Sequence, residues 1–203
     1  EIRLPAPKAV KGLKLGILKN VAMEHVVDLP KKAFESAIDK LKEAGASFSE
    51  IIVSSVDEAM DLTGLLYSPE AYATWKNKIE KTPDLMFAKI LERFRSGANV
   101  LASDFICAWD KLMDLRQQYH SAVKMYDAVL IPTSPIIPPE LDRLMNDGDF
   151  YNSQNLLALR NTRIGNLMGG CSITLPTDIP SCGLLIMGIP SQEERLLRLA
   201  QAC

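Results

Sequence analysis

Apolar and polar residues repeat with two different periods along this chain, and the two periods separate strands from helices. Short apolar runs bounded by glycine or polar residues are typical of strands buried in a sheet. Such runs cover residues 13–18, 48–53, 128–131, 172–175 and 184–187. The last two runs are joined by a loop that contains Pro180, which predicts a hairpin.

Other segments place apolar residues three and four positions apart, the spacing that lines one face of a helix. These segments cover residues 28–44, 59–80, 84–94, 103–124 and 192–202. Because proline lacks a backbone N–H, Pro69 and Pro83 are expected to break the helical region. Asp28 is expected to cap the first helix, with Pro30 in its first turn. Ser103 and Asp104 are start signals for the longest helix.

The order of these elements predicts an α/β fold with a mixed sheet flanked by helices. We expect one segment over residues 1–203, with a linker at 1–10 and a β-α-β unit at 11–56. A helical region would follow at 57–125, and strands around a cleft plus a final helix would occupy 126–203. The linker is predicted from Leu4 to Pro7, whose proline-rich sequence is typical of connections between structured parts.

Composition indicates a folded chain and argues against two classes of partner. With 203 residues and 47% hydrophobic content, the chain could bury roughly 70% of its unfolded surface. A net charge of −2, with acidic and basic residues interspersed, leaves no electrostatic footprint for nucleic acid or an anionic membrane. No apolar run reaches the length of a membrane span, so a cytoplasmic location is expected.

The four cysteines have spacings that match neither a zinc site nor a Cys-x-x-Cys redox motif. They are predicted to be reduced, packed thiols: Cys107, Cys171, Cys182 and Cys203. Only two histidines are present, His25 and His120, so a histidine-rich metal site is excluded. No metal and no cofactor is predicted.

Several segments, taken in chain order, resemble the carboxyl-terminal half of an amidase signature enzyme. They are KGLKLGIL at 11–18, KEAGA at 42–46, RFRSG at 93–97, YDAVLIPTSP at 126–135, NLMGGCSITLP at 166–176 and GLLIMG at 183–188. The resemblance implies that the parent enzyme hydrolyses carboxylic amides to an acid plus ammonia or an amine. In this family a serine attacks the amide carbonyl, and a second serine relays protons to a lysine.

The glycine- and serine-rich run that carries the family's catalytic serines does not occur in this sequence. The chain also begins at Glu1 without methionine, so we expect a fragment that contains no catalytic residue and is inactive alone. A transfer-RNA amidotransferase A-type subunit is an alternative, although GGCSITLPT departs from the Gly-Leu-Pro-Ala type expected there. A non-catalytic binding module derived from an amidase is another. Sheet edges exposed by truncation also predict a homo-oligomer.

The resemblance implies substrate contacts at residues other than the catalytic ones. Arg93 corresponds to an arginine that resembles a carboxylate clamp, a task suited to the forked guanidinium group. Gly169, Gly170 and Cys171 correspond to a turn beside the acyl pocket, where glycine lets backbone approach a ligand. Thr133 is expected to line the cleft. Each has a structural alternative: a solvated helix-end arginine for Arg93, a plain turn for the other four.

Two alternative interpretations would make a residue of the Gly-Gly segment a catalytic nucleophile. Ser172 follows two glycines, as in a serine-hydrolase elbow, but there the serine precedes a helix and here it opens an apolar strand. Cys171 with His120 could form a thiol nucleophile only if something lowered the thiol pKa. Asp127 is predicted to anchor the start of its strand instead of taking part in acid-base chemistry. From the family resemblance, a small amide is the predicted substrate of the parent enzyme.

Overall fold

The computed structural model describes residues 9–203, so the predicted linker at 1–10 lies almost entirely outside the described residues. Its centre is a five-stranded sheet with strand order β2-β1-β3-β5-β4. The strands are β1 (Lys14–Leu18), β2 (Ser47–Ile51), β3 (Ala128–Pro132), β4 (Ser172–Pro176) and β5 (Gly183–Met187). The pairs β2-β1 and β1-β3 are parallel, whereas β3-β5 and β5-β4 are antiparallel. The predicted mixed sheet and the hairpin are both confirmed.

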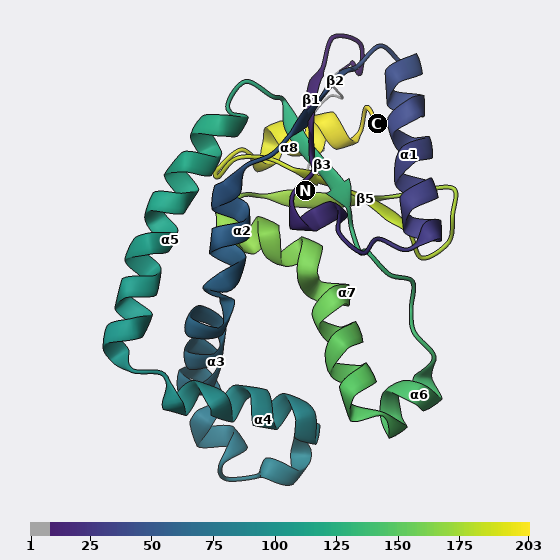
Figure 1. Ribbon diagram of the computed structural model, residues 1–203. Coiled ribbons are helices and arrows are strands. Elements are labelled where there is room, and N and C mark those ends of the chain that lie inside the picture. Colours follow the sequence, from purple (N-terminus) through teal and green to yellow (C-terminus); the bar gives the residue numbers. More distant parts are fainter. Residues whose placement is uncertain (1–8) are drawn as a thin grey trace, which may run out of the picture.

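Helices cover both faces of this sheet (Figure 1). The α-helices are α1 (Asp28–Glu43), α2 (Ser54–Asp61), α3 (Thr63–Ile79), α4 (Ala88–Ser96), α5 (Ala102–Val123), α6 (Leu141–Asn146), α7 (Gly148–Met168) and α8 (Glu193–Ala200). Short 3-10 turns are η1 (Val21–Met23), η2 (Pro83–Leu85) and η3 (Gly97–Asn99). All five predicted strands and the helices at 28–44, 84–94, 103–124 and 192–202 are present, with ends that differ by a few residues.

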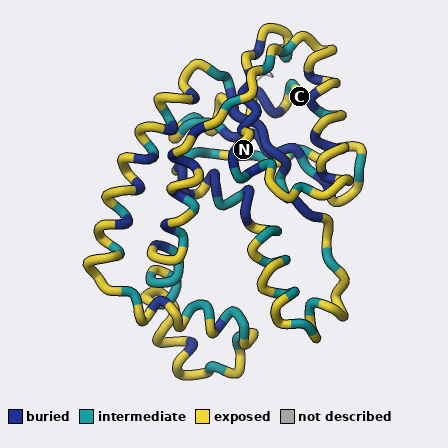
Figure 2. The backbone as a smooth tube through the Cα atoms, in the orientation of Figure 1, coloured by how far each residue is buried: buried dark blue, intermediate teal, exposed yellow. Residues whose placement is uncertain are grey.

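Strand β3 divides the interior into two apolar clusters. All five of its residues are buried. Val129 and Ile131 pack with residues of α2, α5 and α7, whereas Ala128 and Leu130 pack with residues of α1 and α8. A strand buried on both faces is a continuous apolar run, which is why the sequence identified it readily. Figure 2 shows that buried residues are concentrated in this region, while α6 is mostly exposed.

Two predictions about helix ends are wrong, and a third is confirmed to within one residue. Pro69 lies inside α3 and does not break it; the helical region divides instead at Leu62, between α2 and α3. Asp28 is the first residue of α1 and makes no capping hydrogen bond, because Val27 occupies the capping position. The longest helix begins at Ala102, one residue before the predicted start, and Asp104 lies in its first turn as a start signal should.

The sequence prediction missed α7 entirely. Its buried face includes Arg160 and Asn161, and these polar residues interrupt the apolar period by which helices are recognised. Signals for its two ends were available. Asp147 caps it by accepting a hydrogen bond from the Phe150 N–H at 2.9 Å, and Gly169 ends it in a left-handed conformation.

The two polar residues of α7 join three parts of the fold. The side-chain amide of Asn161 donates to the carbonyl oxygens of Ala22, at 3.0 Å, and Pro132, at 2.7 Å. Arg160 donates to the Asn161 side-chain oxygen at 3.1 Å and to the Ala22 carbonyl at 3.2 Å. Asn161 is fully buried. These hydrogen bonds connect α7 to η1 and to the end of β3, where regular pairing leaves carbonyl groups without partners.

We expect Asn161→Leu to lower the free energy of unfolding by about 2 kcal/mol or more, since it leaves two buried carbonyl groups without this donor. Urea denaturation followed by circular dichroism measures the change. Asn152→Leu, at an exposed position of the same helix, is the control and should leave stability within about 0.5 kcal/mol. Equal losses in both variants would show that the buried amide has no special role.

Candidate substrate-binding cleft

A cleft of about 470 Å³ lies between α3, α4 and α7. Its polar lining includes Arg93, Arg163, Tyr67 and Asn166. Its apolar lining includes Met60, Phe94, Leu156 and Leu159. The size is that of a site for a small organic molecule. In Figure 1, α3 and α4 lie on one side of this region and α7 on the other; it is called the α3–α7 cleft below.

Arg93 lines the α3–α7 cleft from α4, and its predicted contact with substrate stays a prediction. Its guanidinium group donates a hydrogen bond to the side-chain oxygen of Asn155 on α7, at 2.6 Å. The neighbouring Arg95 points elsewhere and forms a two-bond ion pair with Glu80, at 3.0 and 2.7 Å. Arg93 is therefore the arginine of this motif that can meet a ligand in the cleft, and it also ties α4 to α7.

Gly97 explains why a glycine follows Arg93 at this spacing. A Cβ atom placed on Gly97 would lie 2.0 Å from the carbonyl oxygen of Ser68, so no side chain fits between η3 and α3. The close approach holds α4 against α3 and so positions one wall of the cleft.

Arg163 and Tyr67 are cleft residues that the sequence prediction missed. The guanidinium group of Arg163 makes no hydrogen bond or ion pair with any residue in the range 9–203. The Tyr67 hydroxyl is buried and also has no hydrogen-bond partner there. Burial raises the pKa of Tyr67, and the nearby charges of Arg163 and Arg116 offset part of that rise. Both residues lie on helices that are only partly apolar, and no motif marks them.

The predicted turn residues lie beyond the end of α7, away from this lining. Gly169 has a φ of 66°, and the N–H groups of Gly169 and Gly170 bond to the carbonyls of Asn166 and Gly165. This is the paired C-cap pattern that ends many helices. A Cβ on Gly170 would lie 2.3 Å from the Gly188 carbonyl oxygen. Both glycines are thus explained by backbone geometry.

Neither Cys171 nor Thr133 lies beside Arg93. The Cys171 thiol contacts the Ile189 carbonyl at 3.3 Å, and burial raises its pKa, so the thiol stays protonated. His120 bonds to the Met168 carbonyl at 3.0 Å and does not line the α3–α7 cleft. The Thr133 hydroxyl bonds to the Thr174 hydroxyl at 3.2 Å. The structure therefore brings Arg93 together with Arg163 and Tyr67, and places the other predicted residues along the sheet.

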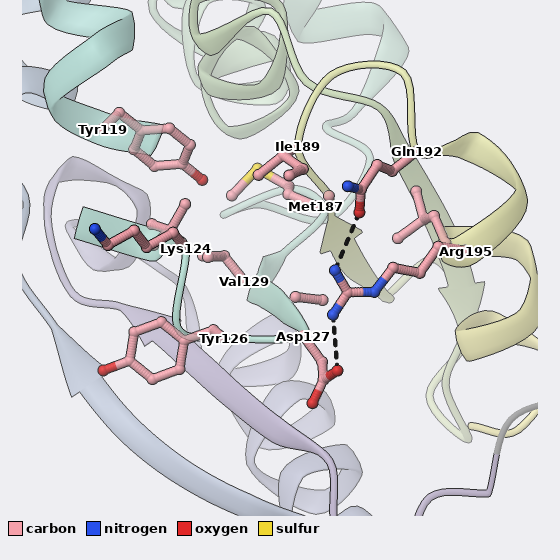
Figure 3. Close-up of a pocket in the computed structure, with 13 residues that line it drawn as sticks. Tyr119, Lys124, Tyr126, Asp127, Val129, Met187, Ile189, Gln192 and Arg195 are labelled. Carbon is pink, nitrogen blue, oxygen red and sulfur yellow. Dashed lines mark hydrogen bonds and ion pairs between the residues drawn. The ribbon is translucent and has the colours of Figure 1, made fainter. Parts of the chain in front are cut away.

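A second hollow, at the start of β3, is too small for a substrate (Figure 3). Its volume of about 30 Å³ suits about one water molecule. Asp127 closes it by accepting hydrogen bonds from the Lys14 N–H, at 2.9 Å, and from Arg195, at 2.8 Å. Arg195 also donates to Gln192, as Figure 3 shows. The predicted anchoring role of Asp127 is confirmed.

All four cysteines are free thiols, as predicted. Cys107 and Cys203 are exposed, however, so the prediction that all four are packed is wrong. Within residues 9–203, no group of three or more His, Cys, Asp and Glu side chains could hold a metal ion. In the same range, no helix combines the length and apolar character needed to cross a membrane.

A family model described as Amidase matches residues 1–197. This chain belongs to the amidase family. The predicted resemblance is confirmed, and it extends over nearly all of the residues that form the sheet and the cleft.

Curated members of the amidase family are similar along the whole chain. A 2-amino-5-chloromuconic acid deaminase of Comamonas testosteroni is 28% identical, with 97% of this chain and 44% of the relative covered. An amidase of Pseudomonas putida is also 28% identical, with 96% and 43% covered. The chain thus spans less than half the length of these relatives.

Solved structures of the family share the fold. The K. lactis urea amidolyase superposes with a TM-score of 0.80 at 18% identity, covering 97% of this chain and 12% of that one. A 6-aminohexanoate cyclic dimer hydrolase gives a TM-score of 0.76 at 18% identity, covering 95% and 44%. At this identity the similarity establishes the architecture of this amidase-family chain and nothing about its substrate.

Replacing Gly97 tests whether its close approach to α3 shapes the cleft. We expect Gly97→Ala to lower the free energy of unfolding by about 1–3 kcal/mol or more, because the new Cβ collides with backbone. Gly64→Ala is the matched control: no atom lies within 4 Å of the added Cβ, so stability should be unchanged or raised by up to about 1 kcal/mol. Thermal unfolding of both variants measures the difference, and equal stability would refute the packing argument.

Proposed function

We propose that this chain is the substrate-recognition part of an amidase that hydrolyses carboxylic amides to an acid plus ammonia or an amine. The observation that carries the proposal is the α3–α7 cleft, which offers cationic and apolar lining residues but, among residues 9–203, no activated nucleophile. Family membership supports amide chemistry, and so does the name of the Pseudomonas putida amidase, whereas the Comamonas testosteroni relative is named for a deamination.

The serine hydroxyls in the cleft are engaged with their own helices. Ser68 donates to the Gly64 carbonyl at 2.7 Å, and Ser96 donates to the Arg93 carbonyl at 2.7 Å. A serine nucleophile needs a base within hydrogen-bond reach, and no described residue of the lining is a histidine, lysine, aspartate or glutamate. We therefore propose that the reacting serines and lysine come from residues outside this sequence, as the family mechanism implies.

In this proposal the chain forms a substrate wall whose parts have different roles. Arg93, fixed by Asn155, orients a polar group of the substrate, while the apolar residues of α7 contact its carbon skeleton. Thr133, after the end of β3, and Gly169, Gly170 and Cys171, before the start of β4, remain predicted substrate contacts, although their positions are also explained by packing.

Two other functions remain to be separated from this one. An amidotransferase A-type subunit is supported by several curated relatives of that kind, including one from Desulforamulus reducens that is 26% identical. The sequence GGCSITLPT still argues against it. A non-catalytic binding module would bind small amides without any catalytic partner. The cytoplasmic location also remains a prediction.

Amide hydrolysis can be tested with a chimera. Residues 1–203 would replace the matching segment of the Pseudomonas putida amidase, and ammonia release from a carboxamide panel would be measured. We expect turnover by the chimera and none by the 203-residue chain alone, since the described residues of the cleft include no nucleophile-base pair. Circular dichroism establishes that each protein is folded.

Two results would refute this assignment. Ammonia release by the isolated chain, abolished by Cys171→Ala or Ser172→Ala, would place the chemistry within it. A folded but inactive chimera that still binds carboxamides would favour the binding module.

Self-association is a separate expectation. In residues 9–203 the sheet has edge strands β2 and β4, and their unpaired backbone groups can pair with another copy. We therefore expect the isolated chain to form a homo-oligomer, with a mass that rises with concentration in size-exclusion chromatography with light scattering. A monodisperse monomer over the whole concentration range would contradict this.

A further inference from the structure

The charged residues that line the α3–α7 cleft are all of one sign. Among residues 9–203, its lining contains two arginines, Arg93 and Arg163, and no aspartate or glutamate. The charge of Arg93 and the burial of Arg163 both lower the pKa of Arg163, with burial the larger cause. An arginine nevertheless remains protonated in a protein, so the cleft holds two positive charges in a partly buried space.

The two arginines differ in what they already bind. Arg93 uses part of its guanidinium group on Asn155, at 2.6 Å. The guanidinium group of Arg163 donates no hydrogen bond to any other residue in the range 9–203, nor does it form an ion pair there. This half-buried guanidinium group can offer its forked pair of donors to an anion in the cleft. Arg163 is therefore the stronger anion-binding candidate of the two.

The Tyr67 hydroxyl supplies a second unused donor beside it. This hydroxyl is buried and unpaired among residues 9–203. Tyr67 and Arg163 both line the α3–α7 cleft, and the charge of Arg163 lowers the pKa of Tyr67, which burial raises. Because burial raises the pKa of Tyr67, the hydroxyl keeps its proton at neutral pH and can donate it to an acceptor.

The remaining lining indicates what accompanies the anion. Met60 from α2 and Leu156 and Leu159 from α7 offer an apolar surface, and Phe94 closes one side. A carboxylate attached to an apolar carbon skeleton matches this combination. Its two oxygens can accept parallel hydrogen bonds from a guanidinium group, and the skeleton can contact the apolar lining.

We propose that Arg163 and Tyr67 form a subsite that binds a free carboxylate of the substrate, so the substrates are amides whose carbon skeleton also carries a carboxylate. This inference rests on the amidase function proposed above. The Comamonas testosteroni relative, which is named for the deamination of 2-amino-5-chloromuconic acid, is consistent with a substrate that carries a carboxylate.

Two probes of equal size test the subsite by binding alone. Adipamate carries one carboxamide and one carboxylate, and adipamide is the neutral diamide of the same skeleton. Isothermal titration of the 203-residue chain at low ionic strength should give saturable binding of adipamate, at least about tenfold tighter than that of adipamide. Equal affinity for the two probes, or no saturable binding of adipamate, would overturn the proposal.

Two variants assign the effect to the named groups. Arg163→Gln should weaken adipamate binding by about tenfold and leave adipamide binding unchanged. Tyr67→Phe removes only a hydroxyl that has no partner in residues 9–203, so it should weaken adipamate binding by about threefold or more without lowering the thermal unfolding temperature. Since Tyr67→Phe preserves the ring, it keeps the test decisive even if Arg163→Gln fails to fold.

The control is Arg198→Gln, which removes the same charge from an exposed position on α8 that is paired with Glu194. It should leave binding of both probes unchanged. An equal loss in Arg198→Gln would mean that net charge alone attracts the probe, and a Tyr67→Phe variant that binds normally but unfolds earlier would mean that the hydroxyl is structural. Either result overturns the subsite.

This test can be separated from the test of amide hydrolysis. Binding that depends on Arg163, together with an inactive folded chimera, would leave the subsite standing and remove the amidase function. In an active chimera, Arg163→Gln should raise KM for adipamate while leaving kcat/KM for adipamide within about twofold. An equal loss for both amides would show that Arg163 pairs with another part of the protein.

Discussion

The buried amide of Asn161 is the interaction on which the arrangement of this chain depends. It reaches two carbonyl groups from segments far apart in sequence, those of Ala22 and Pro132, and Arg160 supports it from the same helix. Without a donor at this position, the backbone at the end of β3 would be buried and unsatisfied. The hydrogen bonds therefore hold α7 at a defined distance from the sheet, and α7 forms one wall of the cleft.

The opposite wall is held by steric fit. Gly97 allows η3 to approach α3 more closely than any other residue would permit, and this contact places α4 beside the cleft. Arg93 then bridges from α4 to Asn155 of α7. One wall is thus fixed by buried hydrogen bonds and the other by backbone contact, with a side-chain bridge between them. Such a frame fixes the spacing of α3 and α7, the helices that carry Tyr67 and Arg163.

The sequence predicted correctly those elements that depend on short stretches of residues, and it failed where contacts between distant segments decide the structure. Strand β3 was found because all its residues are apolar, and the hairpin was found from two apolar runs and a short loop. Helix α7 was missed because the residues that fix it, Arg160 and Asn161, are polar and buried. Pro69 was wrongly expected to end a helix, since α3 continues through the proline, where Gly97 of η3 packs closely against it.

The residues of the candidate site also fall into two groups, those that motifs in the sequence indicated and those that only the structure revealed. The family motif identified Arg93, and the glycines at the end of α7 were recognised as a special backbone position. By itself the sequence determined the α/β class, the family and the strands, because these depend on periodicity and short motifs. Only the tertiary structure decided that Arg163 and Tyr67 meet in one cleft without partners in residues 9–203, because burial and the distance between side chains on separate helices are set by packing across the whole fold.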